Sequence, residues 1–270
     1  MSTASEPAGL VTQLAPEPAV PGAVAPLVTR AERRRRARSR PAEVAMPWMV
    51  AAVTIVLRLM TAASGPTDWD SAQYASAVGH FDVTHGQPQP PGYWLYVVSG
   101  RFLHGAFGVG TVHGLVLMAA LASAAAAGFT ALAGRDLGGW WVGLAAGALV
   151  AASPFAWFSG SAVATYSFDM LACSSLIVLA WRARPGSWHG VGAAITLGLL
   201  AGFRPSVLQC FGLLALIAVL GSTTGSTRRW GRLVITVLAG TAAIGIWLVP
   251  MAFEQPGGLA AWARATRIEA

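Results

Sequence analysis

Asp68 and Asp70 are the most closely spaced acidic residues in the sequence, within the phrase TDWDSAQY at positions 67–74. They follow the first long apolar stretch directly. Carboxylates held beside an apolar wall tend to have raised pKa values, which suits a general base or a cation ligand. Both are therefore candidate catalytic residues, and they are the residues that would hold a divalent cation. The alternative is a solvated loop whose aspartates cap a helix.

A proline-rich phrase, QPQPPGYWLY at positions 87–96, follows in the same segment. Its prolines hold the backbone extended and Gly92 allows a turn, so this stretch should be rigid. A rigid segment with aromatic side chains such as Tyr93 can frame a cavity for an amphipathic ligand. The alternative is a loop that only re-enters the membrane interface.

The elements that position these residues are predicted to be membrane-spanning helices. Of the 270 residues, 55% are hydrophobic and 11% are charged, whereas soluble domains carry about 25% charged residues. All 18 basic residues are arginine, and the absence of Lys and Asn suggests a GC-rich bacterial genome. This composition excludes a water-soluble enzyme, a nucleic-acid-binding domain and a secreted disulfide scaffold. The predicted fold class is all-α, in a polytopic membrane protein.

Seven apolar stretches are long enough to cross about 30 Å of hydrocarbon. We expect 91–108 to lie in the interface instead, because counting it as a span would put the Arg-rich loops opposite the Arg-rich N-terminus. Residues 64–111 then form one external loop, and residues 253–270 also lie outside. The predicted spans are 46–63, 112–133, 139–157, 161–181, 188–203, 205–220 and 233–252.

Residues 1–45 are predicted to be a disordered cytoplasmic tail. Pro, Ala, Glu and Ser dominate its first part, and an arginine cluster follows from Arg30 to Arg40. The cluster is typical of a topology signal that keeps the N-terminus in the cytoplasm; binding to anionic lipid or nucleic acid are the alternatives. The predicted location is the plasma (inner) membrane, with several crossings and the loop 64–111 on the extracytoplasmic side.

The order of these features resembles that of the GT-C glycosyltransferases, especially bacterial members related to the protein O-mannosyltransferases and the aminoarabinose transferase of lipid A. Their first external loop carries a D-x-x-x-Y pattern followed by H-P-P-G-Y or K-P-P-L-Y. Asp70 and Tyr74 match the first pattern, and PPGY at 90–93 matches the second. The phrases SPFAW (153–157), GFRPS (202–206) and WLVP (247–250) extend the resemblance over roughly 46–270. Such enzymes usually have more spans, so the resemblance implies the N-terminal half of a longer, C-terminally incomplete protein.

The resemblance implies an enzyme that passes a sugar from a polyprenyl-phosphate carrier to a lipid, glycan or protein acceptor on the extracytoplasmic face. It implies that Asp70, which heads the D-x-x-x-Y pattern, is the catalytic base. Asp68 would orient the acceptor or help to hold a divalent cation. Tyr74 and Tyr93 would contact substrate. Nucleic acid is not an expected partner.

A lipid-phosphate leaving group needs fixed positive charge in a dry setting, and a guanidinium matches phosphate geometry. Arg204, at the break between the fifth and sixth spans, is the first candidate, and Arg101 is the second. Snorkelling to headgroups is the alternative for Arg204, and it is the expectation for Arg58 in the first span. Asp169, inside the fourth span, is either a substrate contact or the partner of one of these arginines.

Two other kinds of function stay open on the sequence. A transporter or lipid flippase would show broken helices, midplane charges and an internal repeat. No repeat is evident, and the acidic residues cluster at one face. The third reading is a non-catalytic fragment of a glycosyltransferase.

Overall fold

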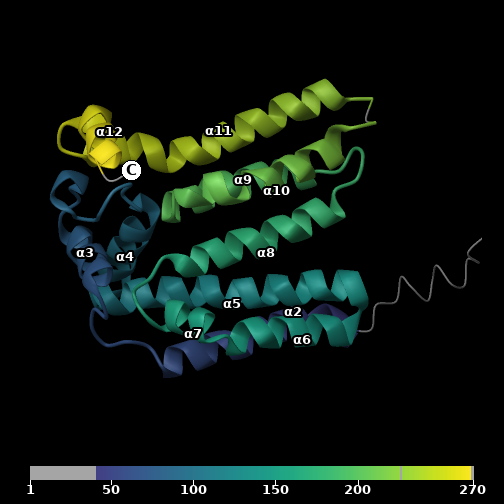
Figure 1. The fold of residues 1–270 in the computed structure, drawn as a ribbon, viewed down its shortest axis with the longest axis horizontal. Helices are drawn as coiled ribbons and strands as arrows, with labels where there is room; N and C mark the ends of the chain where they lie inside the picture. Colours follow the sequence, from purple (N-terminus) through teal and green to yellow (C-terminus); the bar gives the residue numbers. More distant parts are fainter. Residues whose placement is uncertain (1–40, 226, 269–270) are drawn as a thin grey trace, which may run out of the picture. The chain divides into compact units, whose positions relative to one another are not determined.

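The computed structural model describes residues 41–225 and 227–268, which form helices joined by short loops (Figure 1). Within this part of the chain the β pairing is limited to an isolated bridge between Asp82 and Gln87, so the predicted all-α class is confirmed there. The tail predicted over 1–45 lies outside the described residues as far as position 40, and its last residues belong to α2. The elements are α2 (Pro41–Met60), α3 (Trp69–Gly79), the 3-10 helix η1 (Val83–His85), α4 (Trp94–Phe107), α5 (Thr111–Gly138), α6 (Trp140–Ala152), α7 (Pro154–Ser161), α8 (Tyr166–Arg182), α9 (His189–Phe203), α10 (Ser206–Thr223), α11 (Arg229–Glu254) and α12 (Gly258–Ile268).

Glycine and proline set several of the helix ends. Gly139 separates α5 from α6 with φ 86°, a conformation that residues with a Cβ rarely adopt. Pro154 begins α7, and α6 and α7 meet at an angle of 61°. Pro205 lies just before α10, and Arg204 ahead of it has an extended backbone that ends α9. Arg204 therefore lies in a break between two helices.

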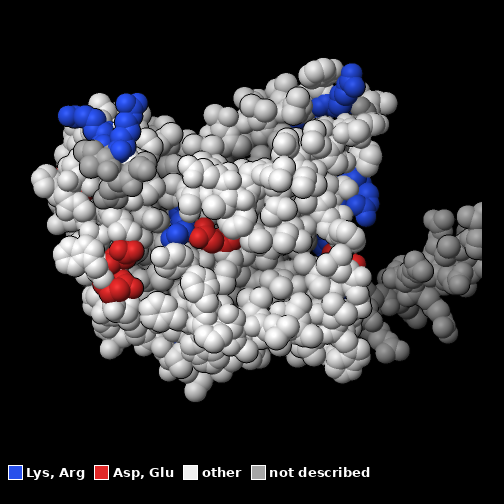
Figure 2. Space-filling view, in the orientation of Figure 1, with Lys and Arg blue, Asp and Glu red and all other residues white. Residues whose placement is uncertain are grey.

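The long helices lie side by side, and α3, α4 and α12 gather at one end of them (Figure 1). This end, which contains residues 61–93, is called the loop end below. The opposite end holds the α8–α9 and α10–α11 connections with their arginines, and the ion pair between Arg182 Nε and Asp136 Oδ2 at 2.6 Å. Much of the surface between the two ends carries no charge (Figure 2). The Arg-rich loops predicted for one side of a membrane thus share one end of the bundle.

Several helices have the length and composition of membrane spans. In the described part of the chain α5, α10 and α11 each meet these criteria, and the bent pair α6–α7 would make a fourth. α2 and α9 contain shorter apolar segments, Val44–Met60 and His189–Phe203, and α8 has 17 residues. These helices are the features of a multi-pass membrane protein.

Small residues bring neighbouring helices close together. A Cβ on Gly147 of α6 would lie 2.7 Å from the Cβ of Ala131 in α5. A Cβ on Gly198 of α9 would lie 2.8 Å from that of Ala243 in α11. Neither glycine has room for a side chain, so glycine at these positions allows close helix packing.

Arg58 departs from its sequence-based expectation. The prediction that it snorkels outward is wrong, because its side chain is fully buried at 0% exposure. Its Nε donates to Ser123 Oγ at 3.2 Å, and Nη2 donates to the carbonyl oxygen of Ala151 at 2.7 Å. α7 can close over it because residue 160 is glycine: a Cβ there would lie 2.9 Å from Arg58 Cδ.

Candidate functional site

α3 begins with a capping box that positions the two first-loop aspartates differently. Asp68 is the N-cap residue, and its Oδ1 accepts a hydrogen bond from the Ser71 amide at 2.7 Å. In return, Ser71 Oγ accepts one from the Asp68 amide at 3.0 Å. Asp70 lies in the first turn of α3, is half-buried, and precedes Tyr74 by one helical turn. Asp70 and Tyr74 therefore share a helix face, while Asp68 caps the helix.

An aromatic cluster forms beneath α3. The Tyr74 ring contacts Tyr93 and Tyr96 edge-on, with centroids 5.1 and 5.4 Å apart. Tyr96 contacts Phe168 of α8 at 5.6 Å, and Phe168 stacks on Phe203 at 4.4 Å. These contacts join the segment 64–111 to the ends of α8 and α9 that lie at the loop end.

Tyr93 has a strained backbone at the start of α4. Its φ of 47° lies in the left-handed region, which is costly for a residue with a bulky side chain. The ring is nevertheless buried against Tyr74. Such strain persists only where the surroundings hold it, and it occurs often at functional sites. The PPGY phrase thus forms a fixed, aromatic wall.

Arg204 lies at the centre of a polar group at the loop end. Its Nε lies 2.6 Å from Oδ2 of Asp169, and its Nη1 donates to Thr165 Oγ1 at 2.8 Å. Its guanidinium carbon lies 4.2 Å from the centre of the Tyr166 ring. The other carboxylate oxygen of Asp169, Oδ1, has no hydrogen-bond partner within the described residues. Of the two alternatives for Asp169, pairing with an arginine is therefore the one observed.

The phenol of Tyr74 connects the first-loop acid to this group. Burial raises the pKa of Tyr74, and the neighbouring Tyr93 and Asp70 raise it further, while a hydrogen bond with Thr165 acts in the opposite direction. The phenol therefore stays protonated. Because Thr165 also accepts from Arg204, two side chains link the Asp70 face of α3 to the guanidinium.

Arg101 belongs to a different set of contacts. Its Nη1 pairs with Glu254 Oε1 at 2.8 Å, and its Nε donates to the Val78 carbonyl oxygen at 3.0 Å. The indole of Trp94 donates to the other oxygen of Glu254 at 2.8 Å. Glu254 at the end of α11 thus holds two side chains of α4, and Arg101 in turn joins α4 to α3. These contacts indicate a structural role for Arg101.

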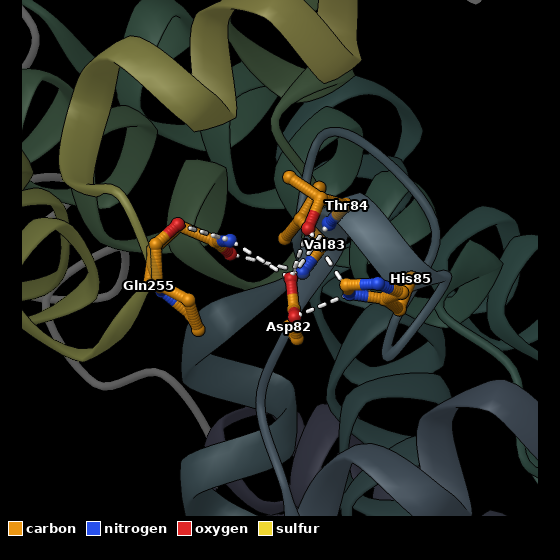
Figure 3. A network of polar contacts seen from close by, with 6 residues as sticks. Asp82, Val83, Thr84, His85 and Gln255 are labelled. Carbon is orange, nitrogen blue, oxygen red and sulfur yellow. Dashed lines mark hydrogen bonds and ion pairs between the residues drawn. The ribbon is translucent and has the colours of Figure 1, made fainter.

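Asp82 and Gln255 form a second connection between the segment 64–111 and the end of α11 (Figure 3). Gln255 Nε2 donates to Asp82 Oδ1 at 3.0 Å, and Gln255 Oε1 accepts from the Val83 amide at 2.9 Å. His85 Nδ1 lies 2.6 Å from Asp82 Oδ2. Burial alone would raise the pKa of Asp82, but hydrogen bonds from Thr84, Gln255 and His85 together hold it below its usual range.

The structure thus brings together most of the residues predicted for the site. Five of them lie at the loop end, namely Asp70, Tyr74, Tyr93, Arg204 and Asp169. The other two have structural contacts: Asp68 caps α3, and Arg101 pairs with Glu254.

Sequence reasoning missed Thr165 and Glu254. A hydroxyl residue directly before an apolar helix could have indicated Thr165 as a residue at a helix start. An acid placed on the same side as the isolated Arg101 could have indicated Glu254. No family model, curated protein or solved structure matches the chain, so function is inferred from the residues and their geometry.

Proposed function

We propose that this chain is an integral membrane glycosyltransferase that moves a sugar from a polyprenyl-phosphate carrier to a lipid, glycan or protein acceptor on the extracytoplasmic face. One observation carries the proposal. Asp70 and Arg204, far apart in sequence, lie at the same end of the helices (Figure 1). Asp70 shares a face of α3 with Tyr74, the Tyr74 phenol neighbours Thr165, and the Thr165 hydroxyl accepts a hydrogen bond from Arg204. A base and a phosphate-binding cation are the two groups that this transfer requires.

The proposed reaction divides the work between these groups. The Asp70 carboxylate accepts the proton of the acceptor hydroxyl as its oxygen attacks the anomeric carbon. The bond between that carbon and the carrier phosphate breaks, and the phosphate leaves with the electron pair. Arg204 stabilises the charge on the leaving phosphate. The unpartnered Oδ1 of Asp169 supports a further contact, because it can accept a hydrogen bond from a sugar or acceptor hydroxyl.

The proposed membrane arrangement has seven crossings, with the loop end extracytoplasmic and the N-terminus in the cytoplasm of a bacterial inner membrane. This arrangement is supported by the arginines of the α8–α9 and α10–α11 connections, which lie together at the opposite end. α5, α10, α11 and the α6–α7 pair would supply four crossings, and the shorter α2, α8 and α9 would supply the other three. The proposed interfacial helix is α4, whose exposed Phe102 and Phe107 suit the headgroup level.

A divalent cation at Asp68 and Asp70 fits the site only with help from the substrate. The described residues contain no group of three or more His, Cys, Asp or Glu side chains arranged to hold a metal. One oxygen of Asp68 already accepts the helix-capping hydrogen bond. Two carboxylates would bind Mg²⁺ if a phosphate supplied further ligands. Such a cation would neutralise charge on the leaving phosphate.

Transfer from labelled polyprenyl-phosphate sugars tests the proposal in liposomes containing the full chain. Asp70→Asn should lower turnover by about 10²–10⁴-fold, the usual contribution of a general base. Asp68→Asn is the matched control, because asparagine keeps the N-cap and the shape of α3, and its loss should be smaller. Equal turnover by wild type and Asp70→Asn would refute the assignment. Movement of intact carrier across the bilayer without cleavage would indicate a flippase instead.

A further inference from the structure

Arg58 is a buried charge without a counter-charge. Its partners are neutral: Ser123 Oγ, the Ala151 carbonyl oxygen, and the Trp157 ring, whose centre lies 4.6 Å from the guanidinium carbon. Within residues 41–225 and 227–268 it makes no ion pair, and its Nη1 has no hydrogen-bond partner. A fully buried cation is costly unless an anion compensates it. An uncompensated charge at membrane depth therefore indicates a binding site.

Two hollows meet at Trp157, directly in front of Arg58. The first is a groove of about 550 Å³ between α2 and α6, which Leu57, Leu144 and Ala148 line together with other apolar side chains. The second, of about 470 Å³, lies at the loop end, and its largely apolar lining includes the hydroxyl residues Thr61 and Ser161. Both volumes are in the range of small-ligand sites. The first hollow is thus an apolar groove, and Thr61 and Ser161 form a polar shelf in the second.

Trp157 separates the two environments. Its indole N–H donates to Thr61 Oγ1 at 3.0 Å, and Thr61 Oγ1 lies 2.9 Å from Ser161 Oγ. Its ring covers Arg58 and also lines both hollows. Tryptophan with one apolar side and one polar edge is typical of the level where lipid chains meet headgroups. The apolar groove thus matches the hydrocarbon chain of an anionic lipid, and the polar shelf and the positive charge match its headgroup.

We propose that these two hollows bind one anionic phospholipid, which we call the α2–α6 lipid site. A hydrocarbon chain lies along the α2–α6 groove, and the phosphate lies on the shelf of Thr61 and Ser161. Arg58 supplies the positive potential behind Trp157 that favours an anionic over a neutral headgroup. The site goes beyond the proposed transfer reaction, because neither Asp70 nor Arg204 lines either hollow.

Native mass spectrometry of the full chain in detergent tests the site. The protein is incubated with phosphatidylglycerol or phosphatidylcholine of identical chains, and the retained lipid is counted. One basic residue near a headgroup should favour the anionic lipid by about fivefold. Arg58→Gln should abolish this preference. Equal retention of the two lipids by wild type would overturn the role of Arg58.

Two exposed alanines of α6 give a test that does not disturb the buried arginine. Ala148 lines the groove, whereas Ala145 is exposed on the same helix outside it. Ala148→Trp should fill the groove and displace phosphatidylglycerol, and Ala145→Trp should retain it as wild type does. Equal retention by the two variants would overturn the groove. Displacement of the lipid by inorganic phosphate would also overturn it, because a headgroup-only site would then suffice.

Discussion

Arg204 and Asp169 form an ion pair in which Nε and Oδ2 lie 2.6 Å apart, at the point where the α9–α10 break meets the first turn of α8. The pair compensates a charge that would otherwise be costly at a helix end within apolar surroundings. It also leaves Nη1 of Arg204 bonded to Thr165, while Oδ1 of Asp169 has no hydrogen-bond partner in the part of the chain that the structure describes. A phosphate that binds Arg204 must therefore share it with Asp169.

The Arg204–Asp169 pair should show strong coupling in a double-mutant cycle. The two side chains are 18% and 26% exposed, so removing either partner leaves a largely buried charge. We expect Arg204→Gln or Asp169→Asn alone to cost about 1–3 kcal/mol, less than a fully buried pair because solvent still reaches both groups. The double variant should lose clearly less than the sum, as measured by chemical unfolding in detergent. Additive losses within about 0.5 kcal/mol would contradict the pairing.

The capping box predicts that two substitutions of Asp68 differ in stability. Asp68→Ala removes the acceptor for the Ser71 amide and should cost about 1 kcal/mol. Asp68→Asn keeps a capping oxygen and should cost little. Limited proteolysis of the external loop reports the difference, since α3 frays when its cap is lost. Similar protection of the two variants would show that the cap does not hold α3.

The contacts of Glu254 predict that it stabilises the packing of α4 against the end of α11. Glu254→Gln leaves Arg101 without its counter-charge and weakens the bond to Trp94. Because Arg101 is 40% exposed, we expect a loss of only about 0.5–1 kcal/mol. Thermal unfolding in detergent measures it, and Arg101→Gln should give a similar loss. No coupling between the two substitutions would mean that the ion pair contributes nothing.

Apolar runs and helix-breaking residues carried much of the fold prediction. The break at 203–206 follows from Pro205, and the start of a helix at Trp94 follows from the prolines before Gly92. Local chemistry was therefore enough to predict both features. The site required more, because only long-range packing places Asp70 and Arg204 at the same end of the helices. The resemblance of the D-x-x-x-Y and PPGY phrases to those of a known family indicated Asp70, Tyr74 and Tyr93.

Arg58 shows where sequence reasoning ended. Its position near one end of α2 favours snorkelling on local grounds. Burial instead depends on Ser123 of α5 and on Gly160 of α7, two small residues whose approach no local pattern reveals. Glu254 was missed as a partner of Arg101 for the same reason: their ion pair joins residues from separate helices.

Acid should loosen the connection between Asp82 and α11. The folded protein holds the pKa of Asp82 below its usual range, so near the unfolded pKa of about 3.9 the unfolded chain binds more protons than the folded one. This stabilisation is complete above that pH and is lost as pH falls through the lower folded pKa. Between pH 6 and pH 3, about the upper part of this range, tryptophan fluorescence during unfolding should show the onset of an acid-induced loss that Asp82→Asn lacks. His85→Gln, which removes the other titratable contact, should retain it; equal pH profiles for wild type and Asp82→Asn would contradict the role of Asp82.

Gly202 and Gly212 give a matched test of the packing that positions the site. A Cβ on Gly202 of α9 would lie 2.5 Å from Leu95 Cδ1 and 2.6 Å from Cγ of Trp247. Leu95 can turn aside, but the root of the indole cannot, so Gly202→Ala should push α11 away and cost about 1–3 kcal/mol. Gly212 of α10 has no atom within 4 Å of the same position, and Gly212→Ala should gain about 0.5–1 kcal/mol from helix propensity. Thermal unfolding compares the two variants. Because Arg204 follows Gly202 at the end of α9, Gly202→Ala should also lower glycosyl transfer. Equal stability and equal transfer in the two variants would refute the close contact between α9 and α11.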